Sequence, residues 1–219
     1  MTGPDERLTA LRGQPGALLV VDVQRSFADP GHLRHLDKAV RARVAAAVEA
    51  TARAVEAARR SGVTVVWTQL RVPPDDVWPA SNWFRGIGED DPWPNEWEPC
   101  VEGTAGVEWY RVEPAAGEAV VPKRTYDGFH GTALADVLAG AGAEWLAVAG
   151  LTSECCVLAT AGGAFTRGFP VVVVAEATTA YEAAAHEAAL LVFSLTCAVV
   201  AGLDDVAAVW VQPSGAGNA

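Results

Sequence analysis

The stretch EWLAVAGLTSECCVLATAGGAFTR, residues 144 to 167, decides how this sequence is expected to fold. Residues 144–150 form a mostly apolar run, which is typical of a strand buried on both faces. An alanine-rich segment with helical character follows from residue 154. Two adjacent cysteines, Cys155 and Cys156, therefore lie where a predicted strand ends and a predicted helix begins.

The same alternation of strand and helix repeats along the chain. Apolar runs predict further strands at 17–23, 63–70, 118–123, 170–177 and 196–202, and helical patterns predict helices at 37–61, 131–141, 154–167 and 181–194. Strands that are apolar almost throughout favour a doubly wound α/β fold, with a mostly parallel six-stranded sheet and helices on both faces. In this class, catalytic groups gather at the carboxyl ends of the strands.

Composition limits the class of protein. With 219 residues, 51% of them hydrophobic, the chain is long enough for one substantial core, and we expect a single domain over residues 1–219. A formal net charge of −11 argues against a nucleic-acid partner, because a phosphate backbone requires a basic face. The four cysteines do not form the pattern of a secreted disulfide framework, and we interpret them as thiols.

The two ends of the chain carry few structural signals. Residues 1–16 are polar and rich in turn formers, and the Gly/Ala-rich tail after Val211 is expected to fray. No apolar run approaches the roughly 20 residues that a membrane span requires. These features predict a cytoplasmic protein with no membrane partner.

Residues 71–117 depart from the regular pattern and are dense in Pro, Gly, Asp and Trp. A loop of this length inside a compact domain is usually functional or disordered, and disordered segments are poor in aromatic residues. We therefore expect an ordered insertion or lid, whose rings face the substrate, form a satellite hydrophobic cluster or contact a neighbouring subunit. Its tryptophans are Trp78, Trp83, Trp93, Trp97 and Trp109.

Reactive side chains stand at three predicted strand ends. Asp22 lies near the end of the first strand, Lys123 ends the third, and the cysteine pair follows the fourth. A carboxylate within an apolar strand is costly unless it is paired or functional. The start of a helix and a nearby ammonium favour the thiolate, which is the nucleophilic form of cysteine. Each group alone also has a structural interpretation, as an ion-pair residue, a surface lysine or a buried thiol.

Together, the blocks LLVVDVQRSF, VVPKRTYDGFHGTAL and VAGLTSECCVLATAGGAFTRGFPVVVVAEA resemble the isochorismatase-like cysteine hydrolases. This superfamily includes nicotinamidases, N-carbamoylsarcosine amidase and ureidoacrylate hydrolases. The resemblance runs from about Ala17 to Val206, and only the tryptophan-rich insertion lies largely outside it. It implies the same α/β fold and hydrolysis through a cysteine nucleophile.

The third block decides which cysteine is the nucleophile. In the superfamily it reads roughly Gly, two small or apolar residues, Thr, two variable residues and Cys-Val. Laid on this chain, the pattern places Ser153 at the threonine, Cys155 at a variable position and Cys156 at the nucleophile. The resemblance also implies that Asp22 is the general base and Lys123 the cationic member of a triad.

Two backbone features are expected beside the nucleophile. An attacked carbonyl develops an oxyanion, which the backbone amides of Thr152 and Cys156 could stabilise. The resemblance further implies an uncommon cis peptide bond between Leu151 and Thr152.

Departures from the superfamily narrow the activity. Nicotinamidases bind a metal through an Asp-x-His pair and a further His near the end of the second strand. Here that place reads WTQLRVPPDD, and no histidine lies between His35 and His130. We therefore expect no metal site and no cofactor. Enzymes that hydrolyse the isochorismate vinyl ether lack the cysteine, so its presence favours cleavage of a C–N bond.

The sequence thus predicts a metal-independent cysteine amidohydrolase that cleaves a small amide, ureido or carbamoyl compound through a thioester. An isochorismatase-type enol-ether hydrolase and a non-catalytic binding protein on the same fold stay as alternatives. Since the resembled superfamily forms homo-oligomers, we expect a homodimer or homotetramer.

Several side chains are expected near the substrate. Gln24 could instead satisfy backbone groups, Phe27 could instead pack in the core, and the remaining candidates could be surface residues. His32, His35 and His186 fit no pattern and are expected to be solvated or to cap. The candidates for substrate binding are Gln24, Phe27, Arg71, Trp78, Trp83, Arg124, Tyr126 and His130.

Overall fold

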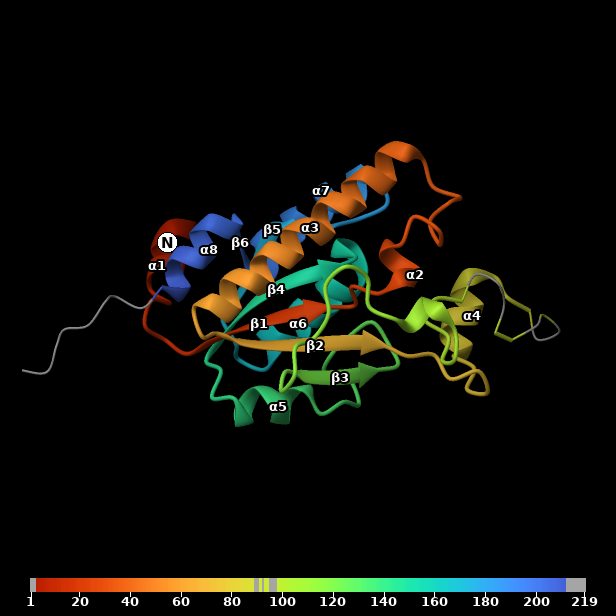
Figure 1. The fold of residues 1–219 in the computed structure, drawn as a ribbon, viewed down its shortest axis with the longest axis horizontal. Coiled ribbons are helices and arrows are strands. Elements are labelled where there is room, and N and C mark those ends of the chain that lie inside the picture. Colours follow the sequence, from red (N-terminus) through yellow and green to blue (C-terminus); the bar gives the residue numbers. More distant parts are fainter. Residues whose placement is uncertain (1–2, 89–90, 92, 95–97, 212–219) are drawn as a thin grey trace, which may run out of the picture.

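The computed structural model describes residues 3–88, 91, 93–94 and 98–211. Within these residues, six strands form one sheet in the order β3-β2-β1-β4-β5-β6, and each neighbouring pair is parallel (Figure 1). The strands are β1 (Gly16–Val21), β2 (Thr64–Leu70), β3 (Ala119–Lys123), β4 (Trp145–Leu151), β5 (Val171–Thr179) and β6 (Val199–Ala201). The predicted six-stranded, doubly wound sheet is confirmed.

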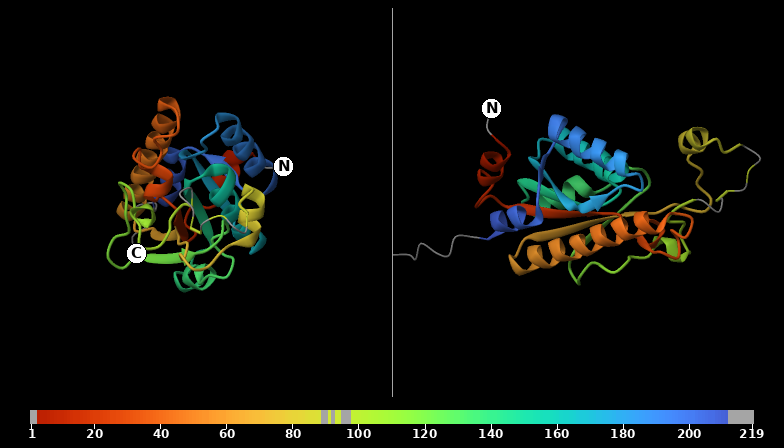
Figure 2. Two further views of the ribbon diagram at one scale, coloured as in Figure 1. Left: turned by 90° about the vertical axis from the view of Figure 1, so that its right-hand side faces the viewer. Right: turned by 90° about the horizontal axis from the view of Figure 1, so that it is seen from above.

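Helices cover both faces of this sheet (Figure 2). One face carries α3 (Lys38–Arg60) and α8 (Leu203–Trp210), and the other carries α5 (Leu134–Gly140), α6 (Leu158–Thr166) and α7 (Ala183–Thr196). Because both faces are covered, the central strands β1 and β4 are buried almost along their whole length. No helix in the described part of the chain is long and apolar enough to cross a membrane.

The predicted element boundaries agree closely with the structure. Every predicted strand is present, and its ends lie within three residues of the prediction. The largest difference is at β6, because Thr196 still belongs to α7 and Cys197 caps that helix. The helix expected at 154–167 opens with a π-helical turn, η2 (Ser153–Val157), before α6.

Five helical elements were not foreseen by the sequence pattern. They are α1 (Pro4–Thr9), α2 (Arg25–Ala28), α4 (Pro79–Arg85), the 3₁₀ turn η1 (Ala105–Val107) and α8. The irregular start expected over residues 1–16 is wrong for α1, which begins at Pro4 and packs Leu8 into the core. The tail after Val211 lies outside the described residues.

The segment 71–117 leaves the carboxyl end of β2 and carries α4 beyond the strand ends (Figure 1). It is tied back to the molecule by a bridge between Val72 and Val101 and a second bridge between Gln24 and Trp109. Leu70, Val72, Cys100 and Val101 also form a small separate core. The described part of this segment is therefore built on the edge of the sheet where catalytic groups were expected.

Candidate active site

The carboxyl edge of the sheet brings together the three side chains predicted as a triad. Asp22 follows β1, Lys123 ends β3, and Cys156 lies in η2 directly after β4. Lys123 Nζ is 2.6 Å from Asp22 Oδ2 and 3.5 Å from Cys156 Sγ. All three residues are buried. The lysine therefore contacts both the carboxylate and the thiol.

The backbone at Asp22 is in a conformation that residues other than glycine seldom adopt. Its φ is 51°, in the left-handed region, which asparagine and aspartate tolerate best among side-chain-bearing residues. The neighbouring strand holds it there: its amide donates to the Thr68 carbonyl at 3.2 Å, and its Oδ1 accepts from Thr68 Oγ1 at 3.0 Å. Its Oδ2 lies 2.6 Å from Lys123 Nζ in the ion pair. One carboxylate oxygen is thus held by β2 and the other by the lysine.

The strands β1 and β4 approach each other closely beside the triad. Gly150 has a φ of 121°, and a Cβ placed on it would lie 2.0 Å from the Val21 carbonyl oxygen. Only glycine fits this position, because it combines a positive φ with the absence of a side chain. The close approach of the two strands at Gly150 lies directly before the end of β4 and the start of η2.

The turn into η2 has the backbone form that the resemblance implies. The peptide bond between Leu151 and Thr152 is cis. The amides of Cys155 and Val157 both donate to the Thr152 carbonyl, at 3.2 and 3.1 Å. The Cys155 amide is therefore already used, and the amides of Thr152 and Cys156 stay the predicted oxyanion donors.

Lys123 is held as an ammonium. Burial lowers its pKa, but the Asp22 carboxylate and the Cys156 sulfur raise it by more, so the pKa lies above its ordinary value. Its Nζ also donates to the carbonyl oxygens of Thr125 and Tyr126, at 2.8 and 3.2 Å. This fixed positive charge can stabilise negative charge on either neighbour.

The two cysteines differ in acidity as well as in place. Their mutual hydrogen bond, burial and the charge of Asp22 raise the pKa of the Cys156 thiol well above its ordinary value, although Lys123 opposes them. The same hydrogen bond lowers the pKa of Cys155. The hydrogen bond to Cys155, burial and the neighbouring carboxylate thus favour the thiol form of Cys156, whereas Lys123 favours the thiolate.

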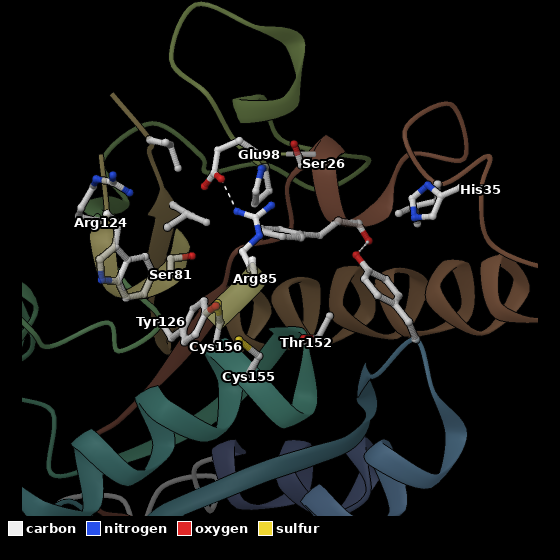
Figure 3. A pocket seen from close by; sticks show the side chains of 17 residues that line it. Ser26, His35, Ser81, Arg85, Glu98, Arg124, Tyr126, Thr152, Cys155 and Cys156 are labelled. Carbon is white, nitrogen blue, oxygen red and sulfur yellow. Dashed lines mark hydrogen bonds and ion pairs between the residues drawn. The ribbon is translucent and has the colours of Figure 1, made fainter. Parts of the chain in front are cut away.

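A cavity of about 310 Å³ opens above Cys156 (Figure 3). Four of the substrate-binding candidates line it, namely Phe27, Trp78, Arg124 and Tyr126. The rings of Trp78 and Tyr126 pack edge to face with their centroids 5.2 Å apart. The wall thus combines the sheet edge, which carries the thiol, with α4 and the start of the insertion.

The other four candidates do not belong to the described lining of this cavity. Gln24 is fully buried, and its side-chain amide exchanges hydrogen bonds with the Leu70 backbone at 2.8 and 2.9 Å. Arg71 is paired with Glu102 at 3.6 Å instead. The ring of Trp83 is 82% exposed on α4, and His130 is exposed after β3. Backbone bonding thus accounts for the position of Gln24, and ion pairing accounts for that of Arg71.

Several lining residues were not identified from the sequence. They include His35, which was expected to be solvated or to cap, and Tyr181, which follows β5. Arg85 and Glu98 also line the cavity and form an ion pair with each other (Figure 3). The position of Tyr181 after a strand end was an available signal, but the pairing across the insertion had none.

The insertion tryptophans have different environments. Trp109 packs edge to face against Trp67 of β2, with centroids 5.3 Å apart, and Trp93 packs against the small core of the insertion. Trp97 lies outside the described residues. Among the insertion tryptophans that the structure describes, Trp78 is therefore the one at the cavity wall.

The donor groups near the site do not assemble into a metal site. In the described part of the chain, no group of three or more His, Cys, Asp or Glu side chains is arranged to hold an ion. Lys123, a cation, occupies the space between the carboxylate and the thiol.

Comparison with known proteins gives consistent matches. The family model described as the isochorismatase domain matches residues 16–205. Maleamate amidohydrolase of Pseudomonas putida is 30% identical over 181 residues, which cover 81% of this chain and 78% of that protein. A ureidoacrylate amidohydrolase of Methylorubrum extorquens is 33% identical over 173 residues, covering 74% of this chain and 68% of that protein.

A solved structure gives the same indication. N-carbamoylsarcosine amidase of Thermoplasma acidophilum superposes with a TM-score of 0.69 at 25% identity, covering 92% of this chain and all 100% of that one. The similarity therefore extends over nearly the whole of both chains.

Proposed function

The chain belongs to the isochorismatase family and is an amidohydrolase, and we propose that it cleaves a C–N bond of a small amide, ureido or carbamoyl compound through a thioester on Cys156. The observation that carries the proposal is the contact of Lys123 with both Asp22 and Cys156 beneath the cavity. Burying a carboxylate and an ammonium beside a thiol costs desolvation free energy, and groups arranged in this way cluster at functional sites.

The first step of the proposed reaction is attack by the Cys156 sulfur on the substrate carbonyl carbon. Asp22, which Lys123 links to the thiol, takes the thiol proton. Lys123 stabilises the developing thiolate, to which it lies at 3.5 Å. The amides of Thr152 and Cys156 donate to the oxyanion of the tetrahedral intermediate.

The second step releases the amine and forms the thioester. The C–N bond breaks as the oxyanion collapses, and Asp22 returns its proton to the leaving nitrogen. Water then adds to the thioester carbonyl with Asp22 as its base, and the carbon–sulfur bond breaks. The products are the carboxylic or carbamic acid and ammonia or an amine, and Cys156 regains its proton.

The insertion at 71–117 is proposed to act as a lid on this site. It contributes Trp78 and Arg85 to the cavity wall from the side facing the sheet edge. Rings at this place exclude water, which strengthens the interactions of Lys123 and protects the thioester from premature hydrolysis.

Assembly into a homodimer or homotetramer is part of the same proposal. The faces of α6 and α7 expose apolar side chains, among them Phe165 at 51%, Leu191 at 58% and Leu195 at 74%. A group of exposed apolar side chains is typical of a surface that another protein covers. A second copy of the chain is the partner we propose.

Release of ammonia or amine from a panel of amides and ureido acids tests the proposed activity. The wild-type chain should release nitrogen from some members of the panel, and Cys156→Ala should release none. Release of pyruvate from isochorismate, with no release of nitrogen from any amide, would instead favour an enol-ether hydrolase.

A further inference from the structure

The charges on the cavity wall indicate which amides the site accepts, an inference that rests on the function proposed above. Among the described lining residues, the side chains with a full charge at neutral pH are Arg85, Arg124 and Glu98. An open guanidinium would favour a substrate with a carboxylate, because arginine binds carboxylates through two parallel hydrogen bonds. Whether these arginines can do so depends on what they already contact.

The first arginine is engaged by a carboxylate of the protein itself. Arg85 ends α4, and its Nη1 donates to Glu98 Oε2 (Figure 3). The side chain of Glu98 is 5% exposed and that of Arg85 is 25% exposed. A substrate carboxylate would have to displace a partner that is always present, and would then leave a buried negative charge unpaired beside its own. Glu98 therefore disfavours acidic substrates.

The second arginine is engaged at the rim. Arg124 Nε donates to Asp76 Oδ2 at 3.3 Å, and its Nη2 donates to the Asp76 carbonyl. Its Nη1 is buried and has no hydrogen-bond partner among the described residues, so it is shielded from a molecule in the cavity. Figure 3 shows Arg124 at the side of the cavity away from Cys156. Both arginines thus already contact a group of the protein, Glu98 in the case of Arg85 and Asp76 in the case of Arg124.

The rest of the wall near the thiol offers apolar contact. Phe27, Trp78, Tyr126 and Tyr181 place four aromatic rings around the cavity. The hydroxyl of Tyr181 donates to the Phe27 carbonyl at 3.2 Å, so this polar group is already satisfied by the protein. A wall of this kind binds a compact apolar body, and its few polar groups orient the reacting end.

From these contacts we propose that the substrate is an uncharged amide with a compact aromatic or branched aliphatic acyl group, and that Glu98 excludes amides that carry a carboxylate. The amide group lies at Cys156, and the acyl body packs against the rings of Trp78 and Tyr126. Glu98 acts as a specificity-determining residue because it supplies the charge that an acidic substrate would otherwise bring to Arg85.

A matched pair of substrates tests this inference. The probes are 4-methylbenzamide and 4-carbamoylbenzoate, which differ in a methyl group against a carboxylate, with ammonia release as the readout. The wild-type chain should hydrolyse the methyl compound with a kcat/KM at least about tenfold higher. Glu98→Gln keeps the shape and the hydrogen-bond acceptor but removes the charge, and it should raise the ratio of kcat/KM for the acid to kcat/KM for the methyl compound by about tenfold.

The control is Glu102→Gln, which removes a carboxylate that pairs with Arg71 outside the described lining of the cavity. It should leave the ratio of the two kcat/KM values unchanged. Faster hydrolysis of the acid by the wild-type chain, or an unchanged ratio in folded Glu98→Gln, overturns this inference and leaves the proposed function standing. If no ammonia is released from either probe or from any other amide, both this inference and the proposed function are overturned. If Glu98→Gln does not fold, the ratio of the two kcat/KM values of the wild-type chain alone tests the inference.

Discussion

The sheet edge and the insertion each place a cation beside a carboxylate at the same cavity, and the two pairs differ in what surrounds them. The side chains of Lys123 and Asp22 are both 0% exposed, and the lysine contacts a thiol. Those of Arg85 and Glu98 are 25% and 5% exposed, and they line the cavity without contacting the thiol in the described structure. The first pair is positioned by strand register, and the second by the path of a loop.

This difference assigns the proposed reaction to the pair on the sheet edge and the proposed substrate selectivity to the pair in the insertion. In the proposed function, residues on the sheet edge carry out the reaction, so their loss should lower kcat. Residues of the insertion are proposed to contact the substrate body and not the reacting atoms, so their loss should mainly raise KM or change substrate preference. Each of the following substitutions tests one side of the comparison.

The largest effect is expected at the nucleophile. Cys156→Ala should lower kcat by at least about a thousandfold, because it removes the thiol that forms the proposed thioester. The matched control is Cys155→Ala, which should keep most of the activity although the pKa of Cys155 is the lower of the two. The reverse pattern in an ammonia-release assay would assign the nucleophile to Cys155.

The next effect concerns the base. Asp22→Asn should lower kcat by about a hundredfold or more, because the thiol proton then has no acceptor. The same change should speed alkylation of Cys156 by iodoacetamide at neutral pH, because the Asp22 charge raises the pKa of that thiol and its removal lowers the pKa. Wild-type alkylation should rise steadily as the pH increases above neutrality.

Opposite changes in turnover and alkylation distinguish a base from a structural residue. Thr68→Val is the control, since it removes the hydrogen bond to Asp22 Oδ1 but leaves the charge. It should change both rates far less than Asp22→Asn does. Slower alkylation in Asp22→Asn would argue against the proposed role of the carboxylate.

A smaller effect is expected in the insertion. Trp78→Ala should raise KM by about tenfold with little change in kcat, because it removes a ring of the cavity wall. Trp83→Ala, on the same helix but with its ring 82% exposed, should change kcat/KM by less than about twofold. Steady-state kinetics on one amide, with the oligomer size checked in parallel, measures both. Equal changes in kcat/KM at the two positions would contradict the proposed role of the insertion as a lid.

The smallest effect on catalysis is expected on α7, at the exposed apolar side chains of the proposed oligomer surface. Leu195→Glu places a charge among the exposed apolar residues of α7 and should weaken the proposed oligomer, while kcat stays near that of the wild-type chain. Light scattering at micromolar concentration reads the mass directly. A monomeric wild-type chain would remove the proposed assembly.

The sheet and the grouping of Asp22, Lys123 and Cys156 at one of its edges could be predicted because their signals are local. Each strand is an apolar run, so Asp22 and Lys123 stand out as polar residues at strand ends, and parallel strands bring those ends to one edge. Gly150 likewise precedes the proposed nucleophile in the third block of the resemblance, so its position could be predicted from the sequence. The acidity of Cys156 could not be predicted, because it depends on burial and on the distance to a carboxylate from another strand.

The insertion could be predicted only in part. The helix α4 does carry end signals, with Pro79 at its start and Gly86 in the left-handed conformation after its end. The pair of Arg85 and Glu98 had no such signal, because it joins residues 13 apart across a stretch without periodicity. The position of Glu98 at the cavity is a consequence of that path, so it appears only in three dimensions.

The most direct test of the central claim is to trap the acyl group on its cysteine. In Cys155→Ser, the tryptic peptide from Thr125 to Arg167 contains Cys156 as its one remaining cysteine. Acid quenching during turnover of an amide, followed by mass spectrometry, should show the acyl group on this peptide. Continued turnover by Cys156→Ala, with the acyl group on Cys155 of its peptide, would contradict the account.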